Sequence, residues 1–151
     1  MLDLPALIEP LFRAAGWQGP RDRPLLDTPP VSAHANASQI VDEFGGLTVG
    51  TCGAGTEMAA SDVRFFERAH SGKSKLFQAW ERQIGEVVAF ASAHHDHMIL
   101  LVGANGRFYV STDPDDQLYA GPHDFGELMR RLLWGYSYGP TVPKDIERSK
   151  L

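Results

Sequence analysis

Hydrophobic residues recur at helical spacing in four parts of the chain. The segments are residues 3–15, 32–44, 74–83 and 124–136, and in each the spacing places the apolar side chains on one face of a helix. Pro10 interrupts the first pattern, because proline lacks a helical N–H donor and clashes with the preceding turn. The first helix is therefore expected either to kink at this proline or to begin there.

Helix boundaries are clearest at the second and last of these segments. Ser32 can cap the second helix and Gly45 can end it. Asp124 can cap the last helix, Glu127 would complete a capping box, and Gly135 lies at its end. The tryptophans lie on or beside the apolar faces, so we expect all of them in the core: Trp17, Trp80 and Trp134.

Short hydrophobic runs predict β-strands between the helices. The first two are "GLTVG" (46–50) and "DVRFF" (62–66). The clearest β signal is a hairpin in which runs 97–102 and 108–112 flank Asn105-Gly106, a pair that favours the positive φ angles of a tight turn. The run "MILLV" is apolar on both faces, so we expect a central strand that is covered on both sides.

The order of these elements predicts an α+β fold. Strands bunched together and joined by hairpins favour a mainly antiparallel sheet of about four to six strands flanked by helices. A proline-rich segment leaves room for a short edge strand near residues 24–27. We expect a single domain over residues 1–138 and a flexible tail over residues 139–151, where apolar residues are few.

Composition and charge narrow the classes of function. The 151 residues are 43% hydrophobic, enough for one domain with a core, and no apolar run approaches the length of a membrane span. With 14 basic and 19 acidic residues the net charge is −5, which argues against nucleic-acid binding and permits a basic protein partner. A start without a basic segment and a single cysteine favour a cytoplasmic protein without disulfides.

The spacing of glycines in the stretch "FGGLTVGTCGAGT" (44–56) is similar to that of a nucleotide-binding loop. Thr56 stands where a phosphate loop needs lysine, and Met58 stands where a dinucleotide loop needs its third glycine. Cys52 would need a lowered pKa and a nearby base to act as a nucleophile, and no flanking pattern indicates a cysteine of that kind. We interpret the stretch as glycines that end a helix and form a flexible loop between strands.

A histidine cluster, "HHDH" (94–97), suggests metal ligation. His95 and His97 would share one face of a strand, which makes them weak candidates for adventitious metal. Two ligands do not make a site, and no H-E-x-x-H motif or cysteine pair is available to complete it. We expect a polar turn here, and neither a cofactor nor a physiological metal.

Several short segments, taken in order, resemble the SUKH superfamily of immunity proteins, specifically its third subfamily. The matching pieces are "LFRAAGWQGPRD" with its Gly16-Trp17, "FGGL" at 44–47, "IGE" at 84–86, "NGRFYV" at 105–110 and "FGELMRRLLWG" at 125–135. A proline separates the expected Gly-Arg pair, giving Gly19-Pro20-Arg21. The resemblance covers about residues 8–136, and it depends on the order and spacing of the pieces.

This resemblance implies a non-enzymatic role. Such proteins are antidotes in bacterial polymorphic toxin systems, where they bind a cognate toxin domain, often a nuclease, and block it sterically. Their fold is α+β, as the element order also predicts. Nuclease toxins tend to be basic where they hold nucleic acid, so we expect the contact in an acidic patch of Asp113, Asp115 and Asp116, with Asp42 and Glu43. No nucleic acid, membrane or small-molecule substrate is expected as a partner.

Two other classes of function stay open. The same superfamily resemblance reaches cell-wall signalling proteins, which implies a non-catalytic scaffold or regulatory adaptor. A small enzyme is the other alternative, and its chemistry would depend on Cys52 or on the histidine cluster.

Overall fold

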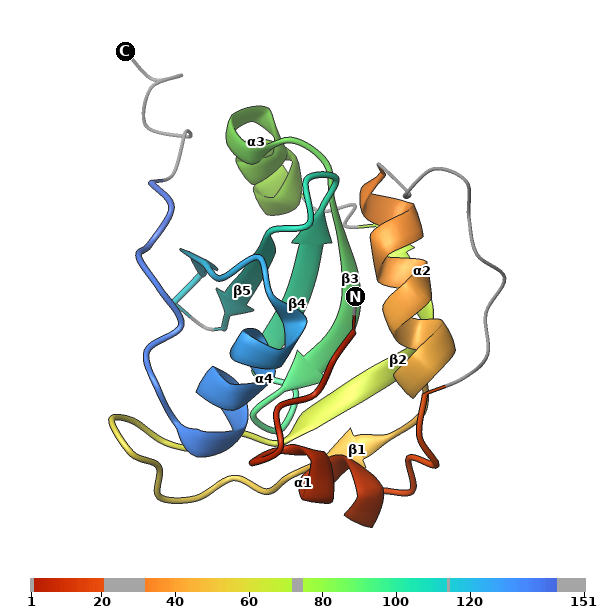
Figure 1. The fold of residues 1–151 in the computed structure, drawn as a ribbon. Helices are drawn as coiled ribbons and strands as arrows, with labels where there is room; N and C mark the ends of the chain where they lie inside the picture. Colours follow the sequence, from red (N-terminus) through yellow and green to blue (C-terminus); the bar gives the residue numbers. More distant parts are fainter. Residues whose placement is uncertain (1, 21–31, 72–74, 114, 144–151) are drawn as a thin grey trace.

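The computed structural model describes residues 2–20, 32–71, 75–113 and 115–143, with only the backbone described for 75–77. Within these residues the chain forms a six-stranded sheet and four helices, as Figure 1 shows. The strands are β1 (Thr48–Val49), β2 (Val63–Ser71), β3 (Val87–Ala93), β4 (Met98–Gly103), β5 (Phe108–Thr112) and β6 (Gln117–Ala120). The helices are α1 (Glu9–Ala14), α2 (Ala33–Phe44), α3 (Lys75–Ile84) and α4 (Phe125–Trp134).

The sheet is an antiparallel meander whose spatial order β1-β2-β3-β4-β5-β6 equals the order along the chain. This arrangement confirms the α+β prediction. It also confirms the hairpin, in which Val102 of β4 pairs with Phe108 of β5 and Gly106 adopts a φ of 85° at the turn. Two strands were not predicted, β3 and β6. The sequence of β3, "VVAFASA", is buried at every position and therefore shows no alternation of polar and apolar residues.

Helices cover both faces of the sheet. Core residues of α1, α2 and α4 pack on one face, whereas Trp80 of α3 packs on the other. The central strand β4 contributes to both cores, because Leu100 and Val102 belong to the first and Leu101 to the second. The prediction of a central strand covered on both sides is therefore confirmed.

A cluster of aromatic rings holds the larger core together. Phe44, at the last residue of α2, stacks on Phe125 of α4 with ring centroids 5.2 Å apart. Its ring also lies 5.1 Å from Phe12 of α1, 5.3 Å from Phe65 of β2 and 5.9 Å from Trp17. Aromatic pairs at such separations stabilise a core by more than the burial of their area. One side chain thus joins three helices and a strand.

The predicted helix boundaries are largely confirmed. The Ser32 side chain accepts a hydrogen bond from Ala35 N at 3.0 Å, and Asp124 accepts one from Glu127 N at 2.9 Å. The first helix is short and begins at Glu9 with Pro10 as its second residue, so the proline lies in the first turn and does not kink the helix. The carboxylate of Glu127 accepts hydrogen bonds from Arg130 and Arg131.

The prediction for the tryptophans is right for two of them and wrong for the third. Trp17 and Trp80 are buried, but the Trp134 side chain is 42% exposed. Trp134 is the last residue of α4, and helical spacing puts it about 180° from the buried Phe125, on the face away from the core. The edge strand suggested near residues 24–27 lies outside the described residues. Of the expected tail, residues 140 and 142 hydrogen-bond to β6, and residues 144–151 lie outside the described part of the chain.

The glycine-rich loop between β1 and β2 is fastened to the end of α4. Its backbone N–H groups donate to carbonyls that the helix end leaves without intrahelical partners. The bonds are Thr56 to Trp134, Glu57 and Met58 to Gly135, and Ser61 to Leu132, at 2.8–2.9 Å. Gly55 and Gly135 allow this approach: a Cβ atom at Gly135 would lie 2.1 Å from the Met58 oxygen. The glycines therefore serve close backbone packing and a helix cap.

No helix in the described residues is long and apolar enough to cross a membrane.

Gly135→Ala is expected to destabilise the protein more than Gly85→Ala. Both glycines follow a helix and have positive φ angles, 76° and 86°, so alanine costs about 1 kcal/mol at either position. Only at Gly135 does the new Cβ also overlap the loop, because Gly85 has nothing within 4 Å. Overpacking of this kind adds about 2 kcal/mol. Urea unfolding measures both variants, and equal losses of stability would contradict the role of Gly135 in holding the loop.

Glu127→Gln is expected to weaken the pH dependence of stability in acid. The hydrogen bonds from Arg130, joined by those from Arg131, lower the pKa of Glu127 from 4.5 to about 2. The ionised carboxylate therefore stabilises the fold above pH 4.5, and this contribution disappears as the pH falls towards 2. The variant should be less stable at pH 7 and lose less stability over that window. Glu57→Gln, at an exposed side chain, is the control and should follow the wild type.

Candidate functional site

Polar loops meet at one end of the sheet. We call this the polar end and define it by Cys52, Asp62, the β3–β4 turn (94–97) and the three acids of the β5–β6 turn. Backbone hydrogen bonds join its parts: His94 N donates to the Asp62 oxygen at 3.0 Å, and Asp113 N donates to the His97 oxygen at 2.9 Å. The meander places both turns at the same end, since β3 and β5 run in the same direction.

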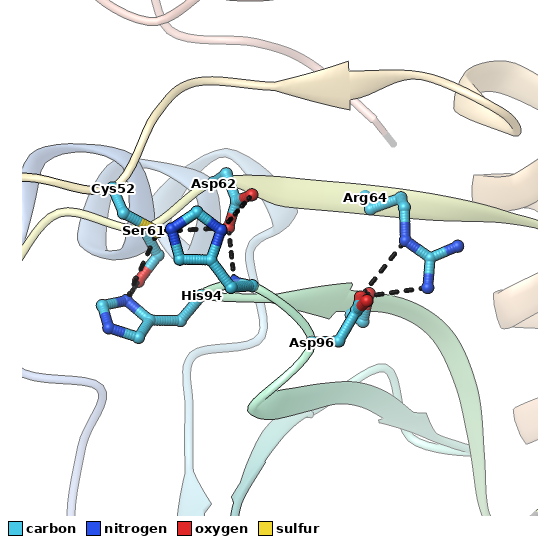
Figure 2. A network of polar contacts seen from close by, with 8 residues as sticks. Cys52, Ser61, Asp62, Arg64, His94 and Asp96 are labelled. Atoms are coloured by element: carbon cyan, nitrogen blue, oxygen red, sulfur yellow. Dashed lines mark hydrogen bonds and ion pairs between the residues drawn. The ribbon is translucent and has the colours of Figure 1, made fainter.

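Asp62 organises the polar end. Its Oδ1 accepts hydrogen bonds from His95 N at 2.9 Å and from the Cys52 thiol at 3.4 Å (Figure 2). The His95 ring adds a contact, with Nδ1 3.7 Å from Oδ2. Partial burial acts to raise the pKa of Asp62, but these hydrogen bonds outweigh it and hold the pKa below its ordinary value. Asp62 is therefore ionised at neutral pH.

Cys52 is not activated as a nucleophile. Burial, with the Asp62 charge acting in the same direction, raises the pKa of its thiol above 9.0, so the thiol stays protonated at neutral pH. A histidine is near, since His94 Nδ1 lies 3.7 Å from the sulfur and 3.3 Å from Ser61 Oγ. A catalytic cysteine needs the opposite shift, so these contacts do not favour a hydrolase or transferase at this site.

The β3–β4 turn has an unusual backbone. His94, His95 and Asp96 have φ angles of 52°, 54° and 68°, in the left-handed region that side chains other than glycine disfavour. Asp96 holds the turn by accepting hydrogen bonds from Ser92 Oγ and from Arg64 Nε and Nη2, at 3.0–3.2 Å for the arginine (Figure 2). These hydrogen bonds lower the pKa of Asp96. The polar turn predicted for "HHDH" is thus confirmed.

The two histidines suggested as metal candidates separate in the structure. His95 lies with Cys52 and Asp62, and one possible ligand atom from each falls within 4.8 Å of the others. His97 is exposed and does not belong to this group. Because residues 94–97 form a turn, the alternation of a strand does not apply to them. No sequence motif links residues so far apart, and this explains why the combination with Cys52 was missed.

The five acids expected in one patch come from two regions. Asp113, Asp115 and Asp116 are exposed on the β5–β6 turn, at the polar end. Asp42 and Glu43 lie on α2, which Figure 1 shows well to one side of that turn. Glu43 is only 8% exposed and accepts a hydrogen bond from Trp17 Nε1 at 3.2 Å. Asp42 is exposed and lines a groove with Glu67 and Arg68 of β2.

Comparison with known protein families identifies the class to which this domain belongs. The family described as SUKH-3 immunity protein matches residues 4–135. The chain therefore belongs to the SUKH-3 immunity protein family, as the ordered segments in its sequence predicted. Searches of curated proteins and of solved structures found no match.

Asp62→Ala is expected to destabilise the protein by about 1–2 kcal/mol, because it removes the acceptor of the hydrogen bonds from the partly buried Cys52 thiol and from the exposed His95 N. Asp62→Asn keeps an acceptor oxygen and should cost less. Asp113→Ala, at an exposed acid of the neighbouring turn, should change stability by no more than about 0.5 kcal/mol. Urea unfolding compares the three, and an Asp62→Ala variant as stable as Asp113→Ala would refute the organising role of Asp62.

Proposed function

We propose that this protein is an immunity protein that binds a cognate toxin domain of a bacterial polymorphic toxin system and blocks it without catalysing a reaction. The observation that carries the proposal is the family match over residues 4–135. The protonated state of Cys52 supports a non-catalytic role, since the best-placed nucleophile at the polar end is a weak one.

Steric occlusion is the proposed mechanism. A rigid antidote blocks an enzyme by covering its active site, and this requires a surface whose charge complements the toxin. The polar end offers Asp113, Asp115 and Asp116 on one exposed turn, in a protein whose net charge is −5. A toxin that acts on nucleic acid is positively charged around its active site, so a nuclease is the class of toxin that fits this turn best.

The two acids of α2, Asp42 and Glu43, are not proposed to contact the toxin directly. Glu43 is buried beneath Trp17, where its hydrogen bond contributes to the fold. Asp42 lies in the groove beside Glu67 and Arg68 and can contribute to the negative field without a direct contact. The direct contact is therefore proposed for the β5–β6 turn.

Co-purification from a lysate of the native host tests the function. The tagged protein serves as bait, and mass spectrometry identifies what binds. Recovery of the C-terminal domain of a large secreted protein supports the proposal and provides the toxin for an inhibition assay. Recovery of housekeeping proteins alone, with no protection against any toxin, contradicts it and favours the scaffold or adaptor role.

Replacing Asp113, Asp115 and Asp116 together by alanine is expected to slow association with the toxin by about tenfold at low salt, because the turn steers a basic partner. The difference should shrink as salt is added, since ions screen the field. Replacing Glu57, Glu67 and Glu86 together by alanine removes three exposed acids elsewhere and is the matched control. Surface plasmon resonance measures the association rates. A triple variant that associates as fast as the control would contradict the proposal that the β5–β6 turn belongs to the interface.

A further inference from the structure

Three side chains at the polar end present a sulfur, an oxygen and a nitrogen donor to one another. The Cys52 sulfur lies 3.4 Å from Asp62 Oδ1, and His95 Nδ1 lies 3.7 Å from Asp62 Oδ2. All three ligand atoms fall within 4.8 Å of one another. Figure 2 shows Cys52 of the glycine-rich loop beside Asp62, which directly precedes β2, and His95 belongs to the β3–β4 turn.

The two contacts to Asp62, which involve its two different oxygens, are close to the ligand separations of a tetrahedral zinc site, and one atom from each of the three residues lies within 4.8 Å of the others. With bonds of about 2.3 Å to sulfur and about 2.0 Å to nitrogen or oxygen, neighbouring ligands of tetrahedral zinc stand roughly 3.3–3.6 Å apart. We propose that Cys52, Asp62 and His95 bind one zinc ion. His94 Nδ1 lies 3.7 Å from the same sulfur but is outside this group, so solvent would fill the fourth position of the ion.

The chemistry of the donors favours zinc over the alkaline-earth cations. Thiolate and imidazole are ligands of zinc, whereas calcium and magnesium prefer oxygen alone. Zinc would replace the proton in the hydrogen bond between Cys52 and Asp62: the S–H bond breaks, a sulfur–zinc bond forms and the proton leaves to solvent. The ion would then neutralise a thiolate and a carboxylate that otherwise repel each other.

The protein holds these ligands in place by contacts that do not involve the ion. The Asp62 carboxylate accepts a hydrogen bond from His95 N, which fixes the backbone of His95, and Asp96 with Arg64 holds the left-handed turn from its other side. The Cys52 loop is fastened to α4 by its backbone hydrogen bonds. The Asp62 side chain is only 20% exposed, whereas the His95 side chain is 70% exposed and lies on the solvent side. Bound zinc would therefore link the loop and the turn directly.

Zinc titration of the protein without a histidine tag tests the proposal, and it does not depend on the toxin. Calorimetry should give one zinc ion per chain for the wild type. Cys52→Ser and His95→Ala should each weaken binding by about tenfold or more, because each removes a ligand. His97→Ala, in the same turn but outside the cluster, is the matched control and should bind like the wild type.

Cobalt provides a second readout that a structural effect of the substitutions would not mimic. The Co²⁺ form should show thiolate-to-metal absorption in the near ultraviolet and the visible bands of tetrahedral cobalt. Both should be absent in Cys52→Ser. Cooperative urea unfolding of each variant confirms that it is folded. Zinc binding that Cys52→Ser leaves unchanged, or that His97→Ala abolishes as fully as His95→Ala does, would overturn the proposal.

Discussion

The packing of Phe44 is the interaction on which the rest of the structure depends. Its ring meets α1, β2 and α4 at once, so the N-terminal helix, the sheet and the last helix share one contact centre. Gly45 follows immediately and turns the chain towards β1. Fixing α4 in this way also fixes its C-terminal end, on which the glycine-rich loop rests. The position of Cys52 and Asp62 thus traces back to an aromatic side chain on another element.

Local signals in the sequence predicted the elements whose cause is local. Ser32 and Asp124 cap helices through their own side chains, and Asn105-Gly106 makes its turn without help from the rest of the chain. The missed strand β3 has no such signal, since burial on both faces removes the alternation that marks a strand. Trp134 was misplaced for a different reason: it lies beside apolar residues in the sequence, but helical spacing puts it about 180° from Phe125, on the face away from the core.

The candidate site was less predictable because tertiary contacts assemble it. Cys52, Asp62 and His95 come together only when β2 pairs with β3 and the loop docks on α4. The left-handed backbone of the turn at 94–96 is equally invisible in the sequence, because its cause is the set of hydrogen bonds to Asp62 and Asp96. Glu43 was also hard to place from the sequence. It was expected in an acidic surface patch with Asp42, but its carboxylate accepts a hydrogen bond from Trp17 in the core.

The two margins of the meander have a consequence for how this family member can meet another protein. On one margin β1 has only two residues, and on the other the main chain at 140–142 already bonds to β6. Within the described residues the β6 margin is therefore partly occupied, whereas β2 continues to Ser71, beyond its two pairs with β1. At the margin next to the β5–β6 turn, recognition then falls to side chains. Such side chains can be substituted without disturbing the backbone pairing of the sheet, so one scaffold can acquire different binding specificities.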